Sequence, residues 1–67
     1  MRIDRVKLIT EMAQRNLKVN VLAELAGVSR MTITSIRCGK SCSKNTALHI
    51  ARALGVDVSE ILEEVKQ

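Results

Sequence analysis

Apolar residues recur three and four positions apart through most of this 67-residue chain, and this spacing favours helices that bury one face. The sequence has no aromatic residue, no proline and only three glycines. A core must therefore be built from Leu, Ile, Val, Ala and Met, and few positions suit the turns of a sheet protein. We expect one compact all-α domain over residues 1–67, because the chain is near the lower size limit for a self-sufficient core.

Five short helices are predicted. They lie within 3–15, from about Val19 to Ala26, from Ser29 to about Arg37, after Ser43, and after Asp57. The apolar positions expected to form the buried faces are Ile3, Val6, Leu8, Ile9, Met12 and Ala13 in the first helix; Leu22, Ala26, Val28, Ile33 and Ile36 in the second and third; and Ala47, Leu48, Ile50, Ala51 and Leu54 in the fourth. Val58, Ile61, Leu62 and Val65 belong to the fifth helix.

Local signals mark where these helices begin and end. Asn16, Gly27 and Gly55 suit the left-handed position that follows a helix. Ser29 and Ser43 have the side chain of an N-cap, whose oxygen accepts from the first turn. Asp57 followed by Glu60 resembles a capping box for the last helix.

The charge is uneven along the chain. The net charge is +4, and no acidic residue occurs between Glu24 and Asp57, whereas the tail after Asp57 is mainly acidic. The cations of the acid-free stretch are Arg30, Arg37, Lys40, Lys44 and Arg52. A basic middle beside an acidic end favours a polyanionic partner on one side of the domain, with an ordinary solvated surface as the alternative.

The second and third helices are separated only by a short break at Gly27. Such a connection holds two helices at a steep angle, and the small side chain of Ala23 allows close approach. If Ile33 and Ile36 face the core, the other face of the third helix carries cationic, hydroxyl and methyl-bearing side chains and no acid. Groups of this kind can bond base edges and phosphates in the major groove of duplex DNA.

Two motifs give this pattern a family resemblance. The first consists of Ala23, Gly27, Val28, Ser29, Ile33 and Ile36, and the second of Thr46, Ile50, Ala51, Ala53, Leu54, Gly55 and Val56. Together they resemble the lambda-repressor-like helix-turn-helix family, the Cro and xenobiotic-response-element-type regulators of bacteria and phages. The resemblance implies a compact five-helix DNA-binding domain with its helix-turn-helix at about 19–37. It also implies a sequence-specific transcriptional regulator of double-stranded DNA, a repressor, that reads the major groove with residues 30–37.

The same resemblance implies the contact residues. Base contacts are expected from Arg30, Met31, Thr34 and Ser35, and phosphate contacts from Asn20, Ser29, Arg37, Lys40 and Lys44. The chain departs from the family pattern where Lys18 and Val19 replace the usual Thr-Gln, which removes a cap and a phosphate-binding amide. The usual proline before the fourth helix is also absent, near Cys42.

A homodimer on two adjacent half-sites is expected, because one recognition helix reads only a few base pairs. The predicted interface is the fifth helix with exposed parts of the first; the alternative is that the fifth helix completes the monomer core. A protein-interaction module on the same fold, such as an antitoxin-like or antirepressor partner, is the competing function, favoured by the missing Gln.

Other classes are disfavoured by the composition. No enzyme is expected, because a lone histidine and an acid-free middle offer no catalytic constellation. Cys38, Cys42 and His49 are too few for a structural zinc site, so no metal, cofactor or small-molecule ligand is expected and both thiols are read as free. A disulfide between the two cysteines that distorts the loop is kept as a hypothesis. No segment is apolar enough to span a membrane, and the predicted location is the cytoplasm.

Overall fold

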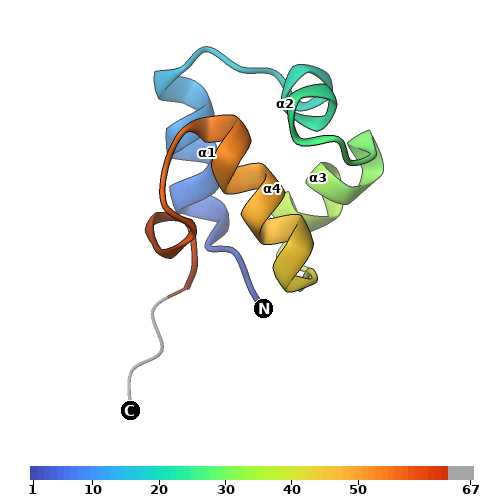
Figure 1. Cartoon of the computed structure of the whole chain (residues 1–67), viewed down its shortest axis with the longest axis vertical. Coiled ribbons are helices and arrows are strands. Elements are labelled where there is room, and N and C mark those ends of the chain that lie inside the picture. Colours follow the sequence, from blue (N-terminus) through green and yellow to red (C-terminus); the bar gives the residue numbers. More distant parts are fainter. Residues whose placement is uncertain (64–67) are drawn as a thin grey trace.

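The structure, a computed structural model, describes residues 1–63, and these form four α-helices followed by one turn of 3-10 helix (Figure 1). The elements are α1 (Arg5–Gln14), α2 (Val19–Ala26), α3 (Arg30–Arg37), α4 (Lys44–Leu54) and η1 (Val58–Glu60). In Figure 1, α4 crosses the middle of the molecule, with α1 to its left and α2 and α3 to its right. The predicted all-α fold is confirmed, and the second to fourth helices have nearly the expected bounds.

The helix ends follow the predicted local signals. Gly27 has φ 71° and Gly55 has φ 74°, and in each case the next residue's N–H reaches back to close the helix. The Val28 N–H donates to the Ala23 carbonyl and the Val56 N–H to the Ala51 carbonyl, both at 3.0 Å. These bonds satisfy carbonyls that the helix itself leaves unpaired.

The helix starts depend on short polar side chains. Ser29 Oγ accepts from the Thr32 N–H at 3.1 Å, and Ser43 Oγ accepts from the Thr46 N–H at 3.2 Å. At the start of α2 the N-cap is Lys18, which makes no side-chain capping bond. The side-chain cap that the family pattern has at this position is therefore absent, as expected from Lys18. The stability of α2 comes from packing instead.

The first helix begins later than the apolar pattern predicted. Asp4 is its N-cap and accepts from the Val6 N–H at 2.9 Å, so α1 starts at Arg5, whereas Ile3 is extended. Only Leu8 and Met12 of α1 are buried; Val6 is 66% exposed, Ile9 is 40% exposed, and Ala13 is also exposed. The predicted burial of Ile3, Leu8 and Met12 is confirmed. The predicted burial of Val6, Ile9 and Ala13 was wrong, because α1 lies at the edge of the domain and buries a single narrow stripe.

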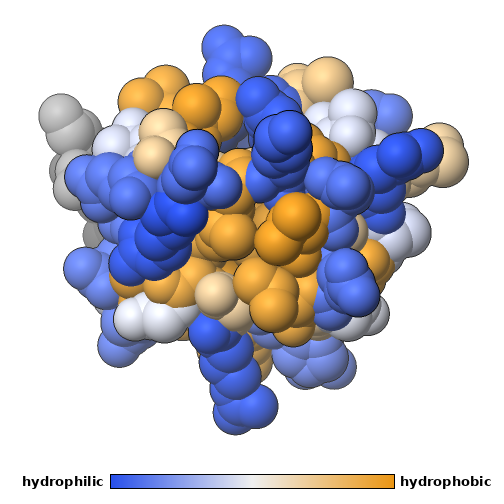
Figure 2. Space-filling model, turned by 90° about the horizontal axis from the view of Figure 1, so that it is seen from above, coloured by the Kyte–Doolittle hydropathy of each residue, from blue (hydrophilic) through white to orange (hydrophobic). Residues whose placement is uncertain are grey.

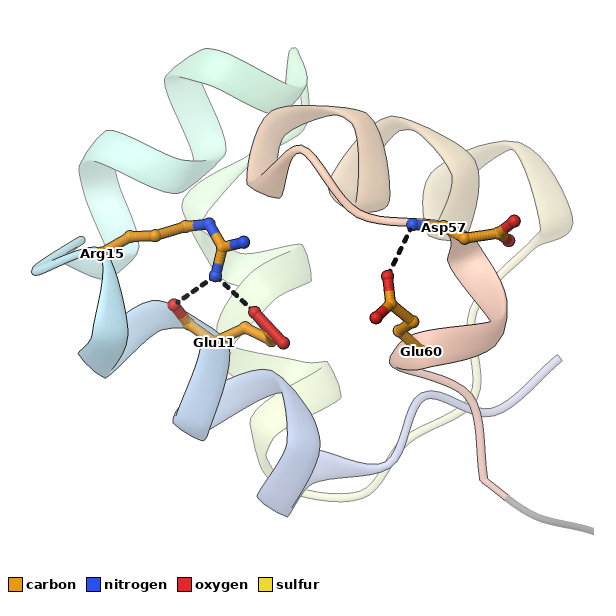
Figure 3. Close-up of polar contacts among 4 residues, drawn as sticks. All are labelled: Glu11, Arg15, Asp57 and Glu60. Carbon is orange, nitrogen blue, oxygen red and sulfur yellow. Dashed lines mark hydrogen bonds and ion pairs between the residues drawn. The ribbon is translucent and has the colours of Figure 1, made fainter.

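The predicted fifth helix is replaced by η1 and an extended segment. The Asp57 N–H donates to Glu60 Oε2 at 3.1 Å, as drawn in Figure 3, so the predicted capping box is present. After this turn Leu62 forms an antiparallel bridge with Ile3, and the Asp4 N–H donates to the Ile61 carbonyl at 2.8 Å. Pairing with the N-terminal segment takes the backbone bonds that a helix would need. Val65 lies outside the described residues.

The core is wholly apolar within residues 1–63. Its most deeply buried large side chains come from every helix and from the C-terminal segment: Leu8, Leu22, Ile33, Ile36, Ile50 and Ile61. Ala23 is 5% exposed and lies in this core, as α2 packs on both α3 and α4. Val28 and Leu48, which were expected to be buried, are only half-buried.

Candidate nucleic-acid interface

The third helix, α3, which is the predicted recognition helix, presents two chemically different faces. Ile33 and Ile36 are 0% and 1% exposed and point into the core, whereas Met31 on the other side is 78% exposed. Arg30 and Thr34 are exposed as well, and Ser35 is half-buried. The four predicted base-contacting residues therefore share the outward side of one short helix, and their contact with bases stays a prediction.

Three hydroxyl groups in and next to this helix already have partners. Thr34 Oγ1 donates to the Arg30 carbonyl at 3.1 Å, which leaves its oxygen lone pairs available to a donor such as an adenine or cytosine amino group. Ser29 Oγ caps the helix and also lies 2.8 Å from Thr32 Oγ1. Ser29 is thus held as a structural cap at the edge of the face, and Thr32, which sequence reasoning missed, completes this pair.

The turn between α2 and α3 sets the direction of the recognition helix. Gly27 adopts a left-handed conformation, and Ala23 and Ala26 are buried, so α2 can pack closely on its neighbours. The axes of α2 and α3 are far from parallel in Figure 1. Within residues 1–63, this arrangement leaves the outward face of α3 uncovered, with Arg30, Met31 and Thr34 exposed.

One set of predicted phosphate-binding cations lies between α3 and the start of α4. A hollow of about 360 Å³ is lined there by Met31 and Ser35 of α3 and by the loop from Lys40 to Ser43. The Lys40 N–H donates to the Ser35 carbonyl at 3.1 Å, which ties the loop to α3. Lys40 and Lys44 are exposed at this edge.

The other set lies on the opposite flank of α3. Arg37 lines a separate hollow of about 320 Å³ with Lys18, Leu17 and side chains of α1, at the entrance to α2. Asn20, the second residue of α2, is also exposed. The structure therefore places Lys40 and Arg37 beside different hollows, Lys40 with Met31 and Ser35, and Arg37 with Lys18. The phosphate contacts of all five predicted residues stay a prediction.

Among residues 1–63, the two cysteines and the histidine do not gather into a site. Cys38 and Cys42 are free thiols that line different hollows, and burial raises the pKa of the Cys42 thiol. His49 is exposed. In the part of the chain that the structure describes, no three metal-ligating side chains come together, and none of its helices has the length and apolar character needed to cross a bilayer.

A packed four-helix domain whose third helix exposes an acid-free face beyond a glycine turn defines the class of helix-turn-helix DNA-binding domains. Comparison with known families agrees: the profile of the Cro/C1-type HTH DNA-binding domain matches residues 7–67. The chain belongs to this family. The lambda-repressor-like resemblance read from the two motifs is thereby confirmed.

This chain resembles one part of a curated relative and one part of each of two solved structures. The HTH-type transcriptional regulator PrtR of Pseudomonas aeruginosa is 53% identical over 45 residues, which are 67% of this chain and 18% of PrtR. A structure of hydroxyethylphosphonate dioxygenase superposes on the whole chain with a TM-score of 0.87 at 27% identity, over 15% of that protein. Native PhpD with cadmium atoms gives a TM-score of 0.84 at the same identity and coverage. The chain thus spans less than a fifth of each of these proteins.

Proposed function

We propose that this chain is the DNA-reading part of a transcriptional regulator and that α3 binds in the major groove of duplex DNA. The observation that carries this proposal is the exposed, acid-free face of α3 with cations on both flanks. Arg30, Met31, Thr34 and Ser35 read base edges, since arginine bonds guanine, hydroxyls bond several base edges and an apolar side chain contacts the thymine methyl group.

The flanking residues hold the domain in register on the backbone. Lys40 and Lys44 meet phosphates at one wall of the groove, and Asn20 and Arg37 meet them at the other. Ser29 contributes at the N-terminus of α3, where the helix dipole favours an anion.

Binding alone is sufficient for repression when the site overlaps a promoter. We therefore propose a cytoplasmic repressor that acts by binding and performs no catalysis.

A homodimer on half-sites about one helical turn apart completes the proposal. Ile61 is 0% exposed within one protomer, so it serves the monomer core rather than an interface. The half-buried Val58 and Leu62, with the exposed Val6 and Ile9 of α1, remain for the contact between subunits.

Binding measurements with matched variants test the proposal. Bound sequences are first selected from a random duplex library, and fluorescence anisotropy then compares Arg30→Ala and Ser35→Ala with the unmodified chain. Each substitution is expected to cost about 1 to 3 kcal/mol at one position of the site. The control is Arg52→Ala, in the last turn of α4, which is expected to change base preference at no position. Uniform losses on every sequence would reassign Arg30 and Ser35 to the backbone.

A protein-interaction module is the second candidate. It is favoured by the uncapped start of α2 and by exposed apolar side chains on that helix, where Val21 is 39% and Leu25 59% exposed. Figure 2 shows one face of the molecule with apolar surface in its middle and hydrophilic side chains around it. Salt dependence separates the two functions, because DNA affinity falls with a log–log slope of about 0.9 per phosphate neutralised. A flat response would favour the protein partner.

A further inference from the structure

The N-terminal segment, residues 1–4, lies between the C-terminal segment and the loop that follows the recognition helix. On one side the Glu63 N–H donates to the Arg2 carbonyl at 3.1 Å, next to the bridge between Ile3 and Leu62. On the other side the Cys42 N–H donates to the Met1 carbonyl at 2.9 Å. The N-terminal segment is thus held in place beside the loop rather than extending freely.

This placement brings basic side chains to the back of the loop. Arg2 Nη2 donates to the Gly39 carbonyl at 2.7 Å, and Arg2 and Arg5 line an open hollow of about 710 Å³ with Cys38 and Gly39. Both arginines are exposed. The nearby Asp4 carboxylate is occupied as the N-cap of α1, accepting from two backbone N–H groups.

The loop separates this basic hollow from the hollow beside the recognition face. Cys38 and Gly39 line the first, and Lys40 to Ser43 line the second, together with Met31 and Ser35. Because Arg2 is bonded to the carbonyl of Gly39, the residue before Lys40, a DNA strand that meets Lys40 would also pass close to Arg2 and to Arg5 beside it. Neighbouring phosphates on that strand are the chemical group that two exposed guanidinium groups would bind.

We propose that Arg2 and Arg5 form a second row of phosphate contacts, which extends the DNA interface from the loop after α3 onto the N-terminal segment. The inference rests on the proposed docking of α3 in the major groove. Because the Gly39 carbonyl already orients Arg2, little side-chain freedom is lost when a phosphate binds.

Glu63 competes with the phosphate for Arg2. Its carboxylate lies 3.9 Å from Arg2 Nε, and the two side chains are 48% and 60% exposed, respectively. An ion pair that is so open to solvent contributes little to stability, so a phosphate can replace the carboxylate at small cost. The Glu63 carboxylate also repels an approaching strand, and its neutralisation should strengthen binding.

The decisive experiment compares Arg5→Gln with Arg52→Gln. Arg52 carries the same charge but lies in the last turn of α4, roughly 12 Å along the helix from Lys44 at 1.5 Å per residue. Anisotropy titrations with a random-sequence duplex at several salt concentrations give the affinity and its salt slope. Arg5→Gln is expected to reduce the slope by about 0.9. If the contribution of Arg5 to the affinity vanishes near 1 M salt, this change in slope corresponds to an affinity about eightfold lower at 0.1 M salt. Arg52→Gln should leave the slope unchanged.

Two further variants complete the test. Arg2→Gln should reduce the slope in the same way, and Glu63→Gln should raise the affinity, with unchanged melting temperature as the check on folding. A steep slope for the unmodified chain, together with equal slopes for the Arg5 and Arg52 variants, would overturn this inference alone. A flat response of the unmodified chain would overturn the docking of α3 and this inference with it.

Discussion

The roles of the inward and outward faces of α3 can be distinguished by substituting residues two positions apart. Ile33 is 0% exposed and Met31 is 78% exposed, so truncation at the two sites should have opposite consequences. Ile33→Ala removes three carbon groups, worth about 2.4 kcal/mol at roughly 0.8 kcal/mol each. The cavity that remains raises the expected loss to about 3 kcal/mol, within the usual range for such a truncation. Met31→Ala should change stability by less than about 0.5 kcal/mol.

A loss of this size is large for so small a domain. At about 0.05 to 0.15 kcal/mol per residue, a chain of this length has a total stability of about 3 to 10 kcal/mol. The melting temperature should fall by about 12 to 24 °C, at about 4 to 8 °C per kcal/mol. Ile33→Ala can leave too little folded protein to measure. Ile33→Val is therefore the second variant, with an expected loss of about 1 kcal/mol in the free energy of unfolding.

The assay is urea unfolding followed by the helical circular dichroism signal, paired with DNA binding by anisotropy. Ile33→Val should shift the unfolding midpoint and leave the affinity of the folded protein unchanged. Met31→Ala should leave the midpoint in place and weaken binding at a thymine position of the selected site. Equal destabilisation by truncation of Ile33 and Met31 would refute the assignment of an inward and an outward face.

The remaining predictions concern the helix cap and the thiols. Ser29→Ala should lower the unfolding free energy by about 1 kcal/mol, because the Thr32 N–H loses its acceptor. Ser29→Asp should keep that stability but weaken DNA binding, since a carboxylate then stands at the recognition face; loss of stability in both variants would contradict the capping role. Alkylation followed by mass spectrometry should modify Cys38 before Cys42, because burial raises the pKa of the Cys42 thiol and leaves less thiolate at neutral pH. The difference should shrink as the pH rises, and faster modification of Cys42 would contradict it.

The division of α3 into two faces was predictable because its determinants are local. Ile33 and Ile36 are one turn apart, and the residues between them necessarily point elsewhere on a helix. The same reasoning identified Met31 as exposed. The pairing of Arg2 with the Gly39 carbonyl was not predictable, because these residues are far apart in sequence and no local signal links them.

The surface of α1 has both kinds of feature, one that the sequence predicts and one that it does not. Arg15 pairs with Glu11 one turn earlier in α1, as Figure 3 shows, and this spacing can be read directly from the sequence. The exposure of Val6 and Ile9 could not be read in this way. The apolar spacing of α1 is compatible with a wide buried face, and only the position of α1 at the edge of the domain leaves that face open.

The sequence by itself determined the positions of the turns and caps, because Asn16, Gly27 and Gly55 occupy left-handed conformations that few other residue types adopt readily. The tertiary structure decided the conformation of residues 61–63. Residues after Glu60 carry a helical apolar pattern, yet Ile61 is drawn into the core and Leu62 pairs with Ile3. The physical reason is that helix signals act within about four residues, whereas this segment gains its backbone bonds and its burial from the opposite end of the sequence.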